Sequence, residues 1–485
     1  MSSRLRRLFK DPDDLDLTSG GIGWPLFYLS LPIVFTNLFQ VAYNLADTFW
    51  LGQLSATALA AITFGFPMVF LLISLGMGVS VAGSVLVAQH TGAEEREAAV
   101  FAASQTVTYA FVLSALLGLG GFFVVEDVLS LVGATGEVLA LATDYLAIIA
   151  LGLPFMFGFF VFIALMRGAG DTVTPMIVMF GTVVVNIALD PFLIFGWGPF
   201  PALGVEGAAI ATIFSRGTAM LVGMGIMLAG TRGIRIRPRQ MIPRPSYLPK
   251  LLRIGAPASV EGAGRAISVN LLLVVVAPFA VAVEAAFGVG IRIFSLVFMP
   301  AIAVDRGVET MTGQNIGAGK PGRAARTNHF AAKASFLILA ALGVVIFLIA
   351  PSLVAVFNDD PIVIREGAAF LRIAAPTFGL IGVVRAYSGG FRGAGRTLTA
   401  AAISITMLGV IRFPIALLAS SGLAPPGWGF LSMPDPTGIW IAFPLSNVVA
   451  ATLAFMWFRR GTWQDADLTG DEPESAEVDG QPTHD

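Results

Sequence analysis

The chain has 485 residues, of which 56% are hydrophobic and only 12% are charged, and its net charge is −2. Soluble domains carry about 25% charged residues, so this composition excludes an ordinary soluble surface, and the charge argues against a nucleic-acid partner. The sequence contains no cysteine, which excludes disulfides, thiolate metal sites and cysteine nucleophiles. Its three histidines (His90, His329 and His484) lie outside apolar stretches, which argues against a histidine metal site or proton relay.

Residues 1–23 are predicted to be a cytoplasmic leader. Arg4, Arg6, Arg7 and Lys10 are followed by aspartates and not by the apolar run of a cleaved signal. Apolar sequence begins only near Trp24.

Twelve apolar segments follow, and each can cross a bilayer core as a helix, for which about 20 residues suffice. They predict an all-α integral membrane protein with twelve transmembrane helices in two pseudo-symmetric six-helix bundles. The first bundle (24–229) contains helices at 24–49, 58–88, 98–123, 139–165, 174–196 and 204–229. A cytoplasmic linker, 230–248, leads to the second bundle (249–458), with helices at 249–276, 284–311, 327–350, 363–391, 397–420 and 434–458. The acidic tail, 459–485, is predicted to be disordered and cytoplasmic.

The two bundles repeat each other at a fixed offset. Residues 89–93 (QHTGA) return at 314–318 (QNIGA), and residues 167–174 (RGAGDTVT) return at 392–399 (RGAGRTLT). The prolines at 32 and 257 and the glycines at 65 and 290 obey the same offset of 225 residues. Two homologous halves in the same orientation are typical of secondary transporters.

Lysine and arginine predict the orientation in the cell membrane. Arg232, Arg235, Arg237, Arg239 and Arg244 crowd the linker, and the loops after the second, fourth, eighth and tenth helices are also basic. The opposite loops are acidic or neutral. Both termini are therefore predicted to be cytoplasmic.

Polar residues form a stripe on the first predicted helix. Asn37, Gln40, Asn44 and Asp47 recur at steps of three, four and three, which places them on one helical face. Such a face is costly against lipid, so the stripe is predicted to line the substrate cavity. The alternative for Asp47 is contact with water at the outer interface.

Asp190 on the fifth predicted helix follows Asn186 by one turn and precedes Pro191, whose ring frees a nearby carbonyl. These oxygens suit Na⁺ or reversible protonation, and Asp190 is also assigned to the cavity. The alternative is a structural hydrogen bond. The second half keeps neither the stripe nor the acid, which favours a functional role for both.

Charges of the second half have simpler interpretations. Glu261 and Arg265 are predicted to form an ion pair one helical turn apart. Asp305, Arg306 and Glu309 are interpreted as a solvated or paired cluster. Arg412 either lines a cavity or extends to the interface, and the two Arg-Gly-Ala-Gly stretches are interpreted as tight basic turns.

The chain resembles the multidrug and toxic compound extrusion (MATE) transporters over nearly all of residues 20–460, most closely a prokaryotic or archaeal DinF-like branch. The features that carry the resemblance are Pro32 with Asn44–Asp47, the two Gln-x-x-Gly-Ala stretches, the two Arg-Gly-Ala-Gly-x-Thr stretches, and Asn186–Pro191. The resemblance implies a V-shaped pair of bundles. It also implies cation ligands in the first bundle (Asp47, Asn186, Asp190 and Thr212, for Na⁺ if Na⁺ is the coupling ion) and a helix hinge at Pro32.

The predicted function is antiport of Na⁺ or H⁺ against amphipathic, often cationic organic compounds, by a monomer in the lipid bilayer. No enzymatic activity is expected, and no cofactor besides the coupling ion. The alternative is a flippase of lipids or lipid-linked oligosaccharides from the same superfamily, which would require a strongly cationic cavity. An intramembrane enzyme is disfavoured, because Asp47 and Asp190 lack a protease context.

Overall fold

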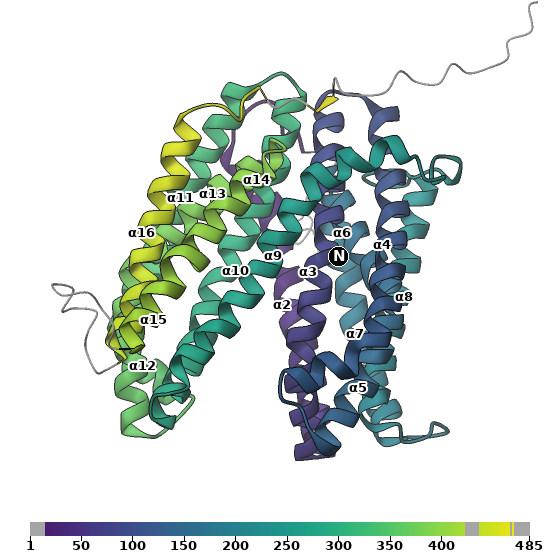
Figure 1. Ribbon diagram of the computed structural model, residues 1–485. Helices are drawn as coiled ribbons and strands as arrows, with labels where there is room; N and C mark the ends of the chain where they lie inside the picture. The colour runs from purple at the N-terminus through teal and green to yellow at the C-terminus, as the bar shows by residue number, and fades with distance from the viewer. Residues whose placement is uncertain (1–14, 422–435, 466–467, 470–485) are drawn as a thin grey trace, which may run out of the picture.

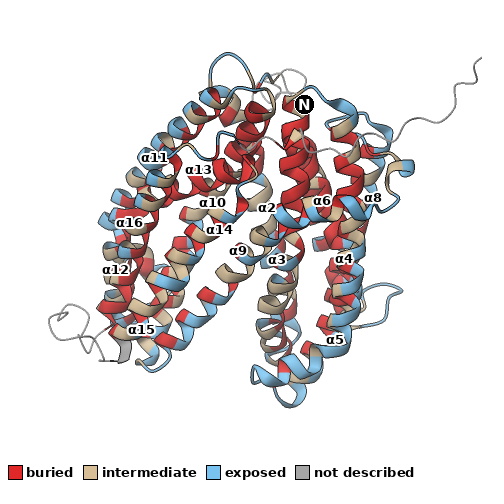
Figure 2. Cartoon of the chain, turned by 45° about the horizontal axis from the view of Figure 1, so that its top comes forward, coloured by how far each residue is buried: buried red, intermediate tan, exposed pale blue. Residues whose placement is uncertain are grey.

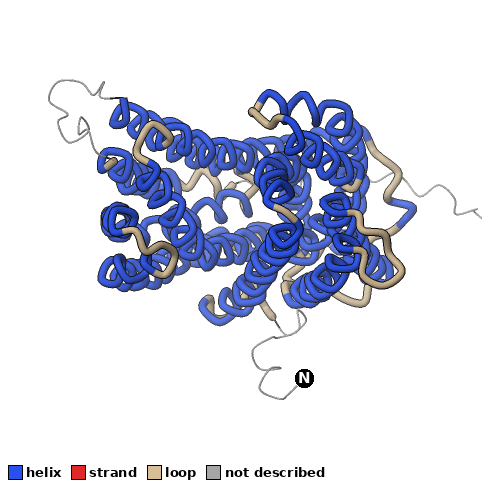
Figure 3. The backbone as a smooth tube through the Cα atoms, turned by 90° about the horizontal axis from the view of Figure 1, so that it is seen from below, coloured by secondary structure: helices blue, strands red, loops and turns tan. Residues whose placement is uncertain are grey.

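A computed structural model describes residues 15–421, 436–465 and 468–469, and these residues form helices and loops without strands (Figure 3). Eleven of the described helices are long and apolar enough to cross a membrane, and one bent helix pair raises the number to twelve. This confirms the predicted twelve-helix membrane fold. The two lobes meet at one end and diverge at the other, as a V (Figure 1).

The N-terminal lobe contains seven helices in the described chain, because one predicted span is broken. The helices are α2 (Gly23–Leu54), α3 (Ala56–Gly92), α4 (Arg96–Leu131), α5 (Gly136–Leu151), α6 (Leu153–Gly168), α7 (Val173–Phe195) and α8 (Gly204–Ala229). The predicted helix at 139–165 is the pair α5 and α6, which bends by 55° around Gly152. Pro154 in the first turn of α6 explains the break, since a proline starts a helix more easily than it continues one.

The C-terminal lobe repeats this arrangement. Its elements are α9 (Leu248–Val276), α10 (Val281–Gly317), α11 (Pro321–Ala355), α12 (Pro361–Ala374), η4 (Ala375–Thr377), α13 (Phe378–Gly393), α14 (Thr397–Ile405), η5 (Thr406–Arg412), α15 (Phe413–Ser421) and α16 (Thr437–Arg459). The predicted helix at 363–391 is interrupted by η4, which contains Pro376. In the predicted helix at 397–420, η5 is a π-helical segment, a rare form that is frequent at functional sites.

Buried residues concentrate where the lobes meet (Figure 2). There α3 packs against α9 and α10, and α2 packs against α10. We call this meeting point the closed end and the opposite side the open end. The linker lies against α4 near the closed end, where Arg237 donates to Glu97 at 2.8 Å.

The two repeated sequence motifs hold the closed end together. The Gln89 amide donates to the Gly393 carbonyl at 3.0 Å, and the Gln314 amide donates to the Gly168 carbonyl at 3.1 Å. Each glutamine motif of one lobe therefore docks on the Arg-Gly-Ala-Gly motif of the other. We call these four residues the interlobe latch. The same contact is thus made twice, once by each copy of the repeated glutamine motif.

Glycine allows the backbones of the two glutamine motifs to approach each other closely. A Cβ added at Gly92 would lie 1.9 Å from the Gln314 carbonyl oxygen, which no side chain tolerates. Gly92→Ala is therefore expected to force the lobes apart at the closed end. The chain has no cysteine, so a Ser74→Cys/Gly262→Cys pair, whose Cβ atoms would lie 3.3 Å apart across the lobes, can report closure by its oxidation to a disulfide.

The disulfide yield of this pair should fall several-fold when Gly92→Ala is added. Gly322→Ala is the matched control, since a Cβ there meets nothing within 4 Å. Equal yields in both backgrounds would contradict the latch.

The described parts of the leader and the tail also pack on the closed end. Leu17 is buried, and its carbonyl accepts from Asn315 at 3.0 Å. Trp463 stacks on Phe458 with ring centroids 4.4 Å apart, and Leu468 donates its amide to Gln89 at 2.9 Å. The sequence predicts disorder for 459–485, but the described tail residues around Trp463 and Leu468 are held in place by these contacts. Residues 466–467 and 470–485 lie outside the described chain.

Candidate cation and substrate sites

Asp47 of α2 and Asp190 of α7 meet inside the N-terminal lobe. Their exposed fractions are 3% and 0%, and their carboxyl groups are close enough to interact directly. Asn186 lies one turn before Asp190 and donates its amide to Asp190 Oδ1 at 3.1 Å. The pair of acids is thus formed by the packing of α2 on α7.

Four buried oxygens around this pair have no hydrogen-bond partner among the described residues. They are Asp47 Oδ1, Asn186 Oδ1, Asp190 Oδ2 and Thr212 Oγ1. Tyr43 joins them, because its hydroxyl lies beside Thr212 and near both acids. Buried polar atoms nearly always have a partner, so four unpartnered oxygens together fit a cation or a proton. The structure therefore brings the predicted ligands Asp47, Asn186, Asp190 and Thr212 into one cluster from α2, α7 and α8.

The polar stripe of α2 does not face a single environment. Asn37 and Gln40 line two cavities, whereas Asn44 is exposed and accepts from Gln40 at 3.0 Å. Asp47 is buried inside the lobe instead. It lies on nearly the same side of the helix as Gln40 but about 10 Å further along the helix axis. Asp47 and Asp190 line neither of these two cavities.

Arg216 on α8 is a buried charge that the sequence analysis missed. It donates to Gln40 Oε1 at 2.7 Å and to the sulfur of Met179 at 3.4 Å, and its guanidinium lies 4.6 Å from the centre of the Tyr43 ring. The available signal was the position of an arginine near the middle of an apolar helix, which is costly in a membrane. Arg216 connects the acid cluster, through Tyr43, with the cavity wall, through Gln40.

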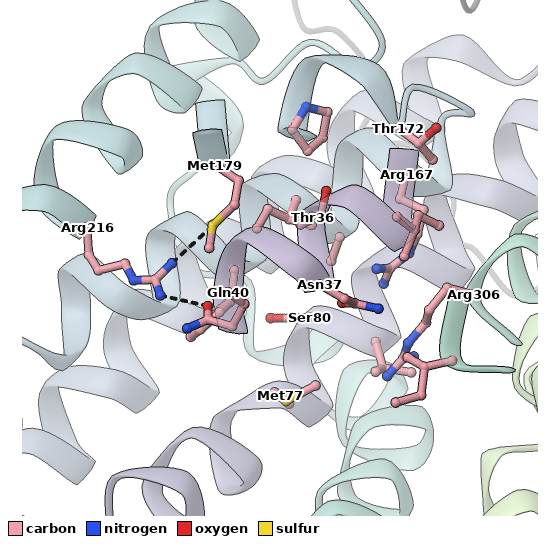
Figure 4. A pocket seen from close by; sticks show the side chains of 17 residues that line it. Thr36, Asn37, Gln40, Met77, Ser80, Arg167, Thr172, Met179, Arg216 and Arg306 are labelled. Carbon is pink, nitrogen blue, oxygen red and sulfur yellow. Dashed lines mark hydrogen bonds between the residues drawn. The ribbon is translucent and has the colours of Figure 1, made fainter. Parts of the chain in front are cut away.

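One cavity lies within the N-terminal lobe next to α10. Its volume is about 230 Å³, and Arg216 stands on one side while Arg167 and Arg306 stand on the other (Figure 4). We call it the N-lobe cavity. No carboxylate is among its lining residues in the described chain.

A second cavity of about 350 Å³ lies between α2 and the C-terminal lobe, and we call it the interlobe cavity. Its walls are largely apolar and include Phe287, Phe294, Phe298 and Phe443. Arg265, Arg385 and Arg412 are its charged lining residues in the described chain. Arg412 thus lines a cavity and does not extend to the interface. The two cavities adjoin, since Asn37, Gln40 and Ile302 line both.

A buried charge cluster centred on Arg392 lies beside these cavities. Its guanidinium bonds Glu261 at 3.0 Å, Glu309 at 3.1 Å and Asp305. Arg265 pairs with Glu261 at 3.2 Å, which confirms the predicted ion pair, and Arg306 pairs with Glu309 at 2.7 Å. The predicted cluster of Asp305, Arg306 and Glu309 is therefore paired and not solvated, with both acids buried and Arg306 partly buried.

The interpretation of Arg392 as part of a basic surface turn was wrong. α13 continues to Gly393, so Arg392 belongs to the last helical turn and points into the lobe, with an exposed fraction of 3%. Arg167, its counterpart at the end of α6, is also largely buried, with 13% of its side chain exposed and its guanidinium 3.9 Å from Glu309. Of the arginines in these two stretches, only Arg396, in the turn that follows α13, is exposed.

Two lobes of membrane-spanning helices, with charged groups buried between and inside them, define a multi-pass membrane protein. A family model described as MatE matches residues 32–192 and again 257–418. The chain therefore belongs to the MatE family, which is a family of transporters and not of enzymes. The two matches begin 225 residues apart, which is the offset of the internal repeat.

Curated relatives and solved structures agree with this family. A protein named "FAD transporter" from Shewanella oneidensis is 27% identical over 92% of this chain and 96% of its own length. A "Probable multidrug resistance protein NorM" from Thermotoga maritima is 29% identical over 90% of this chain and 92% of its own length. A structure described as the outward-facing conformation of a multidrug resistance MATE family transporter of the MOP superfamily shares the fold. Its TM-score is 0.82 at 24% identity, covering 95% of this chain and 98% of that one.

Proposed function

We propose that this chain is a secondary active efflux transporter that carries amphipathic organic compounds outward in exchange for inward Na⁺ or H⁺. The observation that carries the proposal is the cluster of four unpartnered buried oxygens at Asp47, Asn186, Asp190 and Thr212. Two acids inside a membrane are costly, and a bound cation or proton offsets this cost. Relatives named for multidrug resistance support export as the direction of transport.

Helix α2 would couple the two processes, because it contributes to both sites. Asp47 lies in the acid cluster, whereas Asn37 and Gln40 line the cavities. Binding of a cation at Asp47 shifts this helix, and the shift reaches the cavity wall through Gln40 and Arg216. The proposed hinge is Pro32, which is buried inside α2 and removes one backbone hydrogen bond from it.

Pro32→Ala is expected to slow export several-fold, because a continuous α2 resists the bend. The initial rate of dye export in everted vesicles measures this effect. Pro67→Ala is the control, since Pro67 lies inside α3 of the same lobe and its replacement should leave the rate within about two-fold. An unchanged rate in Pro32→Ala would remove Pro32 as a hinge.

The proposed orientation has the closed end and both termini in the cytoplasm and the open end outside the cell membrane. The arginine-rich linker packs on α4 near the closed end, and positively charged segments remain on the cytoplasmic side. We further propose that one chain forms the complete transporter, because the acid cluster and both cavities are built from a single copy.

Transport in liposomes tests the proposal. The full chain is reconstituted, Na⁺ and pH gradients are imposed separately, and dye movement is followed with and without each gradient. Movement against a dye gradient that requires one of the two ion gradients is the expected result. Equal movement with both gradients absent would overturn cation-coupled antiport.

The second candidate is a flippase of lipids or lipid-linked oligosaccharides. It is favoured by Arg265, Arg385 and Arg412 on the wall of the interlobe cavity, because such a substrate carries phosphate. The FAD named for the Shewanella relative also carries phosphate. Gradient-independent movement of a fluorescent phospholipid between leaflets would favour the flippase. The expectation of cationic compounds rests on Asp47 and Asp190, which line neither cavity, so the cavity walls do not support it.

A further inference from the structure

We infer that the interlobe cavity binds amphipathic organic anions. The carboxylate or phosphate of the substrate would lie among Arg265, Arg385 and Arg412, and its apolar or aromatic body would lie on the phenylalanine wall. The inference deepens the proposed function by naming its substrate class. It depends on that function only for the direction of transport, because binding requires no gradient.

Arg412 is the arginine that is most clearly available to a substrate. It ends the π-helical segment η5 and is 4% exposed. It donates to Ser446 Oγ and Asn447 Oδ1, each at 2.9 Å, and lies 4.4 Å from the centre of the Phe443 ring. These partners are neutral, and no described carboxylate forms an ion pair with it. Arginine keeps its charge when buried, so the cavity holds an uncompensated positive charge.

Arg385 and Arg265 compete for acids that are already engaged. Arg385 lies 3.7 Å from Asp305, which Arg392 also bonds. Arg265 pairs with Glu261, which Arg392 bonds as well. In addition, the buried Nε of Arg265 has no hydrogen-bond partner among the described residues.

Counting the charges gives an excess of arginine. Glu261, Asp305 and Glu309 are the three carboxylates of the buried cluster. Five arginines contact these acids: Arg167, Arg265, Arg306, Arg385 and Arg392. Arg412 adds a further positive charge on the interlobe cavity, which Arg265 and Arg385 of these five also line. An anion would balance this excess, whereas a cation would be repelled, and both effects are strong where water is largely excluded.

The apolar walls limit the anion to one with an extended nonpolar part. Phe287, Phe294, Phe298 and Phe443 line the cavity with aliphatic neighbours. Its volume of about 350 Å³ falls in the range of pockets that hold small organic molecules, about 300–1,000 Å³. A simple inorganic anion would leave these walls exposed to water, so an amphipathic anion is the better fit.

Binding of two dyes of similar shape and opposite charge tests the inference. The full chain is placed in nanodiscs of phosphatidylcholine. It is titrated with carboxyfluorescein, which is an aromatic anion, and separately with a rhodamine methyl ester, which is an aromatic cation. The fluorescence anisotropy of each dye is recorded without any ion gradient. Carboxyfluorescein should bind more tightly. Arg412→Gln and Arg265→Gln should each weaken its binding about ten-fold or more, the loss expected for a charged hydrogen bond, without weakening binding of the rhodamine.

Arg292→Gln is the matched control, because Arg292 is an exposed arginine on α10, and it should bind both dyes like the original chain. Arg265 is partly exposed (side chain 32%), so its variant keeps the test valid if Arg412→Gln fails to fold. Tighter binding of the rhodamine, or unchanged carboxyfluorescein binding in the arginine variants, would overturn the inference. Loss of gradient-driven transport with retained anion binding would instead count only against the proposed antiport.

Competition identifies the source of the anion. Displacement of carboxyfluorescein by dihexanoyl-phosphatidylglycerol would support a lipid substrate, and displacement by flavin mononucleotide would support a soluble aromatic phosphate. If neither displaces the dye, the proposed site is wrong.

Discussion

Arg392→Met is expected to destabilise the protein by about 3–5 kcal/mol, the cost of removing one partner from a buried ion pair. The replacement fills similar space but leaves Glu261, Asp305 and Glu309 without the guanidinium that all three share. Each carboxylate would keep only a partner at the edge of the cluster, which is Arg265 for Glu261, Arg385 for Asp305 and Arg306 for Glu309. The measurement is the midpoint of thermal unfolding in detergent, followed by loss of the monodisperse peak in size-exclusion chromatography.

Arg396→Met is the control for this prediction. Arg396 lies four residues further along the chain and is exposed, so its replacement should change stability by no more than about 0.5 kcal/mol. Arg392→Lys should fall between the two, because lysine keeps the charge but cannot bond three acids in the arginine geometry. Equal midpoints for Arg392→Met and Arg396→Met would show that the cluster does not stabilise the fold.

Asp190→Asn is expected to abolish gradient-driven export while leaving membrane insertion and the monodisperse peak intact. The amide has the size of the carboxyl group but neither binds Na⁺ as strongly nor carries a transferable proton. Stability should be unchanged or higher, because the variant removes a buried charge next to Asp47. The measurement is the export rate under separate Na⁺ and pH gradients.

Asp144→Asn is the matched control, since Asp144 is an exposed acid on α5 of the same lobe. It should export at the original rate. The two main variants are expected to differ in what they lose. Arg392→Met should lower thermal stability, whereas Asp190→Asn should abolish gradient-driven export and keep its stability. Retained gradient-driven export in Asp190→Asn would rule out Asp190 as a cation ligand.

The sequence predicted well those features that depend on local composition. Apolar length identified the helices, although Pro154 and Pro376 each interrupt one predicted span. The hydrophobicity of a segment does not reveal the angle between the two helices into which it divides. The π-helical segment η5 was not anticipated either, since its residues read as an ordinary apolar helix.

Only those parts of the candidate sites whose residues are close together in the sequence were predicted. Asp190 and Asn186 stood out because they are four residues apart on one helix and close to a proline. Arg216 was missed, and Arg392 was interpreted as a surface turn, because the partners of each lie far away in the sequence. Glu261, for example, is separated from Arg392 by 131 residues.

The sequence by itself determined the membrane class, the duplicated halves and the presence of two acids in apolar helices, because each of these is recorded in composition, spacing or repetition. Only the tertiary structure decided which charges neutralise one another and which remain for a ligand. It joined the repeated motifs into a latch between the lobes, and it placed Asp47 and Asp190 away from the cavities that arginines line. The physical reason is that a buried charge is stabilised by the groups packed around it, and in a bundle of long helices those groups come from distant parts of the chain.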